Sequence, residues 1–211
     1  MSRTVLIIFA ALFPVYCHAQ SDSTGKLNTC EYNLKLGYNS SLIFPGISTG
    51  IEFHLCKMDS MISVRHSGSK PLTRNRFISA NLNWYHHPAF HDNLYLTAEW
   101  VMRRTRKNGF ISEFSFGPGF SRTFLGGTTY LINGSGDVSV VKLAGYSYAL
   151  LTVGEGFGID FSVKKHLPFS AVAKMNLITM FPYNSSFYFR PVLELGIRYK
   201  PLHGKCKLFK N

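Results

Sequence analysis

Three histidines and an aspartate lie close together and could place ligands around a metal ion. His86, His87 and His91 are followed by Asp92, and imidazole nitrogens and carboxylate oxygens are common metal ligands. Two interpretations stay open: capture of a metal or haem by these side chains, or ordinary interfacial histidines beside Trp84. We favour the second, and therefore predict neither a resident metal nor a cofactor.

His66 and Ser67 form a second candidate, a nucleophile beside a base. A serine nucleophile needs a base within hydrogen-bond reach and a third group that orients the base. Adjacent residues in a strand point to opposite faces, and the sequence contains no Gly-x-Ser-x-Gly motif. We therefore predict that the protein is not an enzyme, and keep a lipid A modifying activity as an alternative.

A glycine-rich run, 154–158, resembles a dinucleotide-binding loop only by composition. Such a loop follows a strand and opens a helix, and that context is missing here, so glycines within a strand explain the run better.

Charged side chains at alternate positions form the clearest chemical pattern of the chain. Along 186–200, Arg190, Glu194 and Arg198 occupy even positions, while the odd positions are apolar or aromatic. This period of two predicts a β-strand with two different faces, and the charged face is too costly to bury unpaired in a dry core. The pattern is typical of a membrane-spanning strand, apolar toward lipid and polar toward a lumen.

Seven further segments alternate in the same way, which makes eight in all. An open sheet would leave unpaired edges in lipid, so the strands must close on themselves. We predict an all-β protein, a transmembrane antiparallel up-and-down β-barrel of eight strands, or of ten if 56–75 holds two more. The predicted strands are 31–39, 47–55, 76–85, 93–104, 110–122, 144–163, 168–181 and 186–200.

Three local irregularities are expected in these strands. The sixth segment changes phase near Glu155, which leaves its facing residues undecided. Glycine and proline in 117–119 predict a bulge or bend, and Pro191 predicts another bulge because proline cannot donate to a ladder.

Nine charged residues fall on the predicted lumenal face, four acids against five bases. The interior of an eight-stranded barrel is only just wide enough for side chains to fill, and an unpaired ion there is expensive. We therefore predict a plug of ion pairs, with a narrow pore or a lumenal ligand site as the alternative. The residues are Lys35, Glu52, Glu99, Arg103, Glu113, Lys174, Arg190, Glu194 and Arg198.

The N-terminus predicts export. Arg3 precedes an apolar run and a small residue at position 19, the organisation of a secretory signal peptide. We divide the chain into a signal peptide, 1–19, a polar leader, 20–29, a barrel domain, 30–200, and a basic tail, 201–211.

Composition and charge agree with a membrane barrel. Aromatic residues make up 15% of the chain and charged residues only 16%, and the formal net charge is +12. A basic balance indicates an anionic partner. Export makes nucleic acid the weaker choice, so we expect outer-membrane lipids and lipopolysaccharide as partners.

An even number of strands puts both termini at one end of the barrel, the periplasmic end in this class of protein. The loop 123–143 then faces outward, and Asn133-Gly134 between β-prone runs predicts that it projects as a β-ribbon. Most excess basic residues collect at the opposite rim. They are Lys57, Arg65, Lys70, Arg74, Arg104, Arg106, Lys107, Lys164, Lys165, Lys205, Lys207 and Lys210.

Three cysteines remain after the signal peptide. Cys30 and Cys56 come at the same end of the first predicted hairpin, and an oxidising compartment would allow a disulfide between them. Their predicted faces differ, which weighs against the bond, and Cys206 would have no partner.

The chain resembles the small outer-membrane β-barrel proteins of Gram-negative bacteria. The resemblance rests on the signal ending His18-Ala19-Gln20, the closing run 195–200, and the stretches 99–109, 116–128 and 180–186. It covers roughly residues 30 to 200 and implies an outer-membrane location and insertion by the barrel assembly machinery. The function we expect is structural or surface interaction, with outward loops that contact glycolipid or another surface ligand; a narrow porin-like channel is a further alternative.

Overall fold

The computed structural model describes residues 32–41, 44–64, 68–88, 91–134, 136–183 and 186–201. The predicted signal peptide, polar leader and most of the basic tail lie outside these ranges. Among the described residues, no helix is both long and apolar enough to span a membrane.

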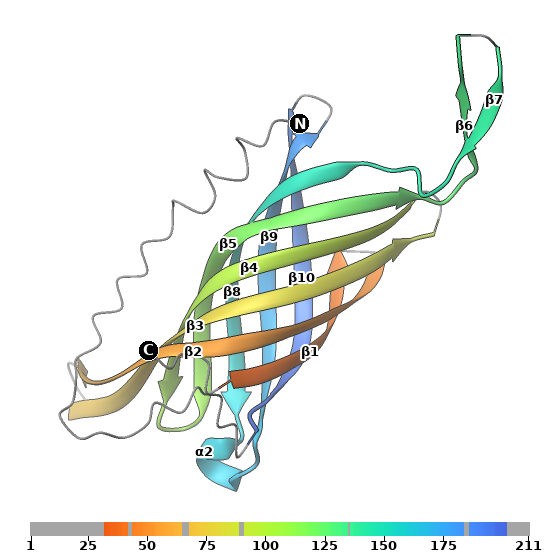
Figure 1. Ribbon diagram of the computed structural model, residues 1–211. Helices are drawn as coiled ribbons and strands as arrows, with labels where there is room; N and C mark the ends of the chain where they lie inside the picture. The colour runs from red at the N-terminus through yellow and green to blue at the C-terminus, as the bar shows by residue number, and fades with distance from the viewer. Residues whose placement is uncertain are drawn as a thin grey trace, which may run out of the picture.

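Eight antiparallel strands close into a barrel, which confirms the predicted fold class (Figure 1). Around the barrel the order is β1, β10, β9, β8, β5, β4, β3, β2, and β1 closes the ring on β2. The strands are β1 (Tyr32–Ser41), β2 (Phe44–Val64), β3 (Gly68–His87), β4 (His91–Arg106), β5 (Phe110–Leu125), β8 (Ser147–Asp160), β9 (Phe169–Tyr183) and β10 (Ser186–Tyr199).

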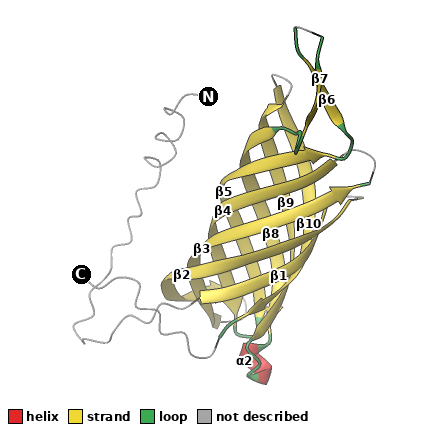
Figure 2. Cartoon of the chain, turned by 45° about the vertical axis from the view of Figure 1, so that its right-hand side comes forward, coloured by secondary structure: helices red, strands yellow, loops and turns green. Residues whose placement is uncertain are grey.

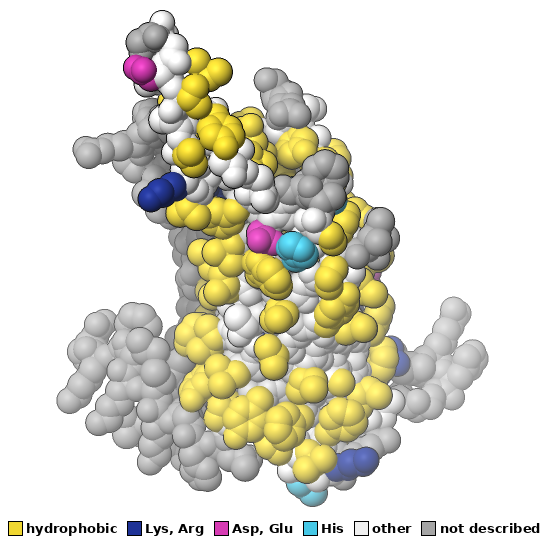
Figure 3. All heavy atoms as spheres, turned by 90° about the vertical axis from the view of Figure 1, so that its right-hand side faces the viewer, with side chains coloured by type: hydrophobic (Ala, Val, Ile, Leu, Met, Phe, Trp, Pro, Cys, Tyr) yellow, Lys and Arg dark blue, Asp and Glu magenta, His cyan; other side chains and the backbone are white. Residues whose placement is uncertain are grey.

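The alternating sequence places apolar side chains outside the barrel and polar ones inside. Leu36 is 64% exposed and Met175 is 67% exposed, whereas Glu52 and Ser79 are fully buried. The flank of the molecule is accordingly covered mainly by apolar side chains (Figure 3). Exposure of such an apolar surface to water is unfavourable, whereas its contact with lipid is not. Apolar side chains outside and polar ones inside are therefore the distribution of a membrane-spanning barrel.

The two ends of the barrel differ. At one end, β5 and β8 are joined through a separate two-stranded ribbon, β6 (Thr129–Ile132) and β7 (Val138–Val141), as the Asn-Gly turn predicts (Figure 2). At the other end, the short helix α2 (Ser162–Lys165) connects β8 to β9. We call these the ribbon end and the helix end.

Residues 56–75, which the prediction of eight strands leaves as a connection, are neither a long turn nor two further barrel strands, so the option of ten strands is wrong. Instead, β2 and β3 continue as one hairpin, paired as far as Val64 and Gly68. This hairpin runs beyond the pairing of β3 with β4, which ends at Leu72 and Arg106. The part of a strand that extends beyond the bilayer does not contact lipid and needs no apolar face. Its sequence therefore need not alternate between apolar and polar residues, although its backbone stays paired.

Two predicted irregularities are absent. β8 keeps one phase throughout, and Glu155 points outward. Pro191 pairs with Leu177 of β9 without a register shift. The pairing of β10 with β1 has already ended at Leu193, so the missing N–H of the proline interrupts no ladder on that side. The shift in β10 lies instead between Ser186 and Tyr188.

The predicted bulge at 117–119 is also missing. The pairing of β5 with β8 runs through Gly117 and Pro118 without a shift. Against β4 the ladder is interrupted there but resumes in the same register. The backbone therefore stays extended, and glycine serves close approach instead: a Cβ on Gly117 would lie 1.9 Å from the Ala98 carbonyl oxygen.

Basic side chains surround the helix end. Arg74, Arg104, Arg106, Lys107 and Lys165 are all exposed there. Arg65 and the three lysines of the tail lie outside the described residues, as do the side chains of Lys57, Lys70 and Lys164.

Candidate functional site

The barrel interior is the candidate functional site, because it collects the ionisable side chains. All nine residues that the alternation assigns to the lumen point inward. Eight of them are buried, and the Glu194 side chain is 13% exposed. They come from six strands, β1, β2, β4, β5, β9 and β10.

Four of these residues form a charge-neutral cluster, which we call the quartet: Glu52, Arg103, Glu113 and Arg198. The Nη2 of Arg103 donates to Glu52 Oε2 at 2.8 Å, and its Nε donates to Glu113 Oε2 at 3.1 Å. Arg198 bridges the same carboxylates, with Nε 3.0 Å from Glu52 Oε1 and Nη2 donating to Glu113 Oε1. Asn33 donates a further hydrogen bond to Glu52 at 3.2 Å. Arg103 and Glu113 face each other on neighbouring strands, whereas Glu52 of β2 and Arg198 of β10 come from strands that are adjacent neither to these two nor to each other, so the quartet crosses the lumen.

A second neutral cluster lies beside the quartet and contains Lys35, Glu99, Lys174 and Glu194. Lys174 Nζ donates to Glu99 Oε2 at 2.5 Å, and Lys35 Nζ lies 3.7 Å from Glu194 Oε1. Asn81 joins the pairs: it accepts from Lys35 at 3.0 Å and donates to Glu99 at 3.1 Å. We call this the lysine cluster.

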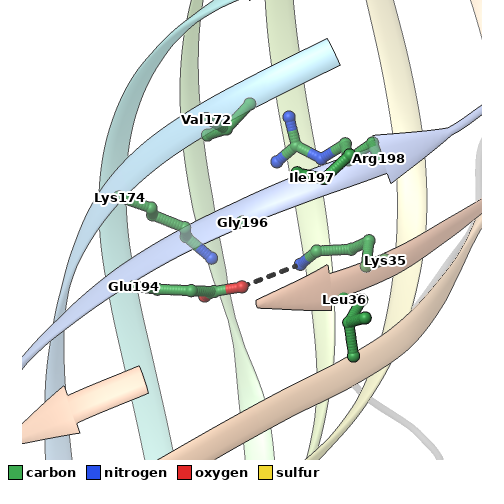
Figure 4. A pocket seen from close by; sticks show the side chains of 8 residues that line it. All are labelled: Lys35, Leu36, Val172, Lys174, Glu194, Gly196, Ile197 and Arg198. Carbon is green, nitrogen blue, oxygen red and sulfur yellow. Dashed lines mark ion pairs between the residues drawn. The ribbon is translucent and has the colours of Figure 1, made fainter. Parts of the chain in front are cut away.

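Little space remains between the two clusters. Figure 4 shows Lys35 of β1 and Glu194 of β10 pointing toward each other, with Lys174 and Arg198 on either side. The cavity that these side chains line has a volume of about 10 Å³, room for no more than about one water molecule. Side chains therefore leave little free space around Lys35, Lys174, Glu194 and Arg198.

Arg190 is the ninth lumenal charge and differs from the rest. It is only 4% exposed, yet among the described residues none of its three guanidinium nitrogens makes a hydrogen bond of standard geometry, and its contact with the Tyr85 side chain is a weak one. Its Cζ lies 4.3 Å from the ring centroid of Tyr85 and 5.2 Å from that of Tyr95. The four lumenal glutamates are engaged in the quartet and the lysine cluster, so Arg190 is the base left over by the count of five against four.

The three histidines that were weak candidates for a metal site do not converge. His86 points outward and its Nδ1 lies 2.6 Å from Asp92 Oδ1, whereas the rings of His87 and His91 stack at 5.3 Å. Successive residues of a strand take opposite faces, which separates His86 from its neighbour. Within the described ranges, no group of three or more potential ligands could hold a metal ion.

His91 lies at the ribbon end, where it is the first residue of β4. Its Nε2 is 3.3 Å from the Tyr85 hydroxyl oxygen.

A polar vestibule opens into the lumen at the helix end. Its volume is about 190 Å³, and the quartet arginines Arg103 and Arg198 line it. His54 and Asn75 belong to the same wall, with His54 Nε2 3.2 Å from Asn75 Oδ1. The vestibule thus reaches the quartet from one side.

Several uncharged lumenal residues were not singled out from the sequence. Asn33, Asn81 and Thr97 supply hydrogen bonds to the buried glutamates, and Tyr85 and Tyr95 flank Arg190. Asn33, Thr97 and Tyr95 share the parity of a charged lumenal residue on their own strand, whereas Asn81 and Tyr85 lie opposite the apolar positions of β3, so the alternation that located the charges could also have located them.

Two other candidates, the His66 and Ser67 pair and the Cys30 to Cys56 disulfide, lie outside the described residues and side chains. The glycines of 154–158 belong to β8, where a Cβ on Gly154 would lie 2.1 Å from Asn176 Oδ1. They make room for lumenal side chains.

Several solved structures have a similar overall shape. A designed transmembrane β-barrel is 12% identical, with 83% of this chain and 98% of that chain covered and a TM-score of 0.40. Ail, the attachment invasion locus protein of Yersinia pestis, is 9% identical, with 82% of this chain and 97% of that chain covered and a TM-score of 0.44. The outer membrane enzyme PagL is 11% identical, with 81% of this chain and 97% of that chain covered and a TM-score of 0.35. No protein-family model matches the sequence, and no curated protein matches it.

Proposed function

We propose that this chain is an outer-membrane β-barrel with a structural or surface-interaction role, and that its lumen is closed by its own ion pairs. The observation that carries the proposal is the pair of neutral clusters across the barrel interior. A hydrated ion would have to separate salt bridges such as Lys174 to Glu99, at 2.5 Å, in order to pass.

The apolar outer surface of the barrel supports the outer-membrane location, because it suits the hydrocarbon core of a bilayer. A closed barrel with an apolar outer belt has no unpaired sheet edge to expose to lipid. Single-chain barrels of the bacterial outer membrane have even strand numbers beginning at eight. The resemblance seen in the sequence points to the same membrane.

The ribbon supports the surface-interaction role. Cross-strand pairing puts Tyr130, Ile132, Val138 and Val140 on one face of it, and all four are exposed, Ile132 to 70%. An exposed apolar patch on a projecting element is a common mark of an interaction site. Lipopolysaccharide, which presents acyl chains and sugars at the outer surface, is the partner we propose for this face.

Planar-bilayer recordings test the closed lumen. The refolded chain should insert without producing conductance steps, under conditions in which an open porin gives them. Steps that change in size in a Glu194→Gln variant would show a narrow channel and contradict the proposal.

Binding to lipopolysaccharide vesicles tests the ribbon. Ile132→Ser together with Val138→Ser should weaken binding by about tenfold or more, because the variant loses two apolar contacts of its exposed face. Thr129→Ser on the other face of the ribbon is the matched control and should bind like the wild type. Equal binding by all three proteins would exclude the ribbon as the contact.

A further inference from the structure

We infer that Arg190 is the centre of a phosphate-binding site at the ribbon end of the lumen. The inference goes beyond the proposed function, because a closed barrel with an interacting ribbon does not need it. It begins from the one lumenal charge that the two clusters leave without a counter-ion.

An isolated guanidinium is expensive to bury. Taking a cation out of water costs several kcal/mol unless an anion and hydrogen bonds compensate. The rings of Tyr85 and Tyr95 give Arg190 cation–π contacts, but a ring face cannot accept the in-plane hydrogen bonds of the five guanidinium N–H groups. All three nitrogens are fully buried and none makes a hydrogen bond of standard geometry among the described residues, since the contact with the Tyr85 side chain is only a weak one. An anionic acceptor would complete this environment.

The surroundings of Arg190 hold groups that donate to an oxyanion. The Tyr85 hydroxyl and His91 Nε2 are hydrogen-bonded at 3.3 Å, and when Nε2–H donates to the hydroxyl oxygen, the hydroxyl proton is left to donate to an anion. Asn39 Nδ2 already donates to the Tyr95 hydroxyl at 2.7 Å, which leaves the hydroxyl proton available. Phosphate brings several acceptor oxygens at once, and arginine binds it through two parallel hydrogen bonds.

The position along the barrel indicates the route of access. Tyr188 comes two residues before Arg190 on the same face of β10. It lies near the ribbon end and is 42% exposed. In the other direction, Val192 and then Glu194 follow on the same face of β10, so the lysine cluster blocks the way. A phosphate therefore reaches Arg190 from the ribbon end, past Tyr188 and its stacked neighbour Tyr183, whose ring centroids are 4.9 Å apart. The phosphate is either free in solution or carried by a glycolipid headgroup.

Thermal unfolding of the whole chain, refolded in detergent micelles, tests the inference. Inorganic phosphate should raise the midpoint in the wild type, because a ligand that binds only the folded state stabilises it. In Arg190→Met this rise should disappear, and calorimetry should show phosphate affinity reduced by about tenfold or more. Arg190→Lys keeps the charge without the fork and should fall between the two.

Arg122→Gln is the matched control. Arg122 is a cation of the same end, but it lies outside the lumen and donates to Ser147 at 2.9 Å. Its loss should leave phosphate binding unchanged. An equal loss in Arg122→Gln and Arg190→Met would assign the binding to general rim charge and overturn the inference.

A second arm separates the two sources of phosphate. Micelles that contain phosphorylated lipid A are compared with micelles that contain the dephosphorylated lipid, in the absence of free phosphate. Stabilisation by inorganic phosphate supports a soluble ligand, and stabilisation by the phosphorylated lipid alone supports a headgroup. If neither probe stabilises the wild type, and Arg190→Met is destabilised on its own, Arg190 is held by its tyrosines alone and the inference is wrong. Neither result depends on the conductance of the barrel.

Discussion

The lumenal charges act as groups rather than as separate residues. In the quartet, each arginine contacts both glutamates, so removal of one member leaves an uncompensated charge in a buried site. Burial makes that change costly, whereas removal of an oppositely charged pair keeps the cluster neutral.

The quartet should therefore show strong coupling between Glu113 and Arg198. Glu113→Leu alone and Arg198→Met alone should each lower the free energy of unfolding by about 3 kcal/mol. The double variant should lose less than the sum, by about 2 kcal/mol, because Glu52 and Arg103 remain as a neutral pair. Urea unfolding in phospholipid vesicles measures all four proteins, and additive losses would mean that the contacts contribute independently.

Glu155 is the charged residue that faces away from the lumen in the middle of β8. It is exposed and pairs with Phe114 of β5 and Met175 of β9, so lipid surrounds it. Glu155→Leu should raise the free energy of unfolding by about 1 kcal/mol, since a carboxylate on a lipid face is destabilising. Glu99→Leu, in the lysine cluster, is the control and should have the opposite sign. A loss of stability in Glu155→Leu would reveal a partner for the carboxylate within the membrane.

At the level of elements, close approach between β4 and β5 depends on a glycine. Because a Cβ on Gly117 would lie 1.9 Å from the Ala98 carbonyl oxygen, one of the two strands would have to move. The ladder between these strands is already interrupted there, so little pairing is left to hold them together.

Gly117→Ala should therefore impair barrel closure. We expect a loss of about 2 kcal/mol or more in unfolding free energy, together with a smaller folded fraction after refolding. Gly134→Ala in the ribbon turn is the control, because nothing lies within 4 Å of the added carbon. Equal folding of both variants would show that β4 and β5 can separate at no cost.

For the whole molecule, the apolar belt and the closed ladder predict its behaviour in detergent. The refolded chain should be rich in strand by circular dichroism and should migrate faster on a gel unheated than boiled, because the closed barrel resists the denaturant. A product that is soluble and folded without detergent would mean that the apolar faces pack against each other, and would contradict the membrane-barrel fold.

The sequence by itself determined the faces of the strands. Along a strand, side chains alternate by backbone geometry, so the parity of Arg190, Glu194 and Arg198 placed all three inside without knowledge of any neighbour. The same local rule predicted the count of five bases against four acids. It failed in β8, where Leu150 and Leu151 are both apolar and the glycines carry no facial preference, so that Glu155 remained unassigned.

Only the tertiary structure decided which charges meet. Glu52 and Arg103 are 51 residues apart, and their contact depends on how far each strand is staggered along the barrel axis, a property of the closed ring. The stagger places four acids against four bases and leaves Arg190 beside aromatic rings. It also lets β2 and β3 continue past the membrane, where no lipid imposes a pattern on the sequence. Local alternation fixes a side chain's face, whereas its partner is set by strand register around the whole barrel.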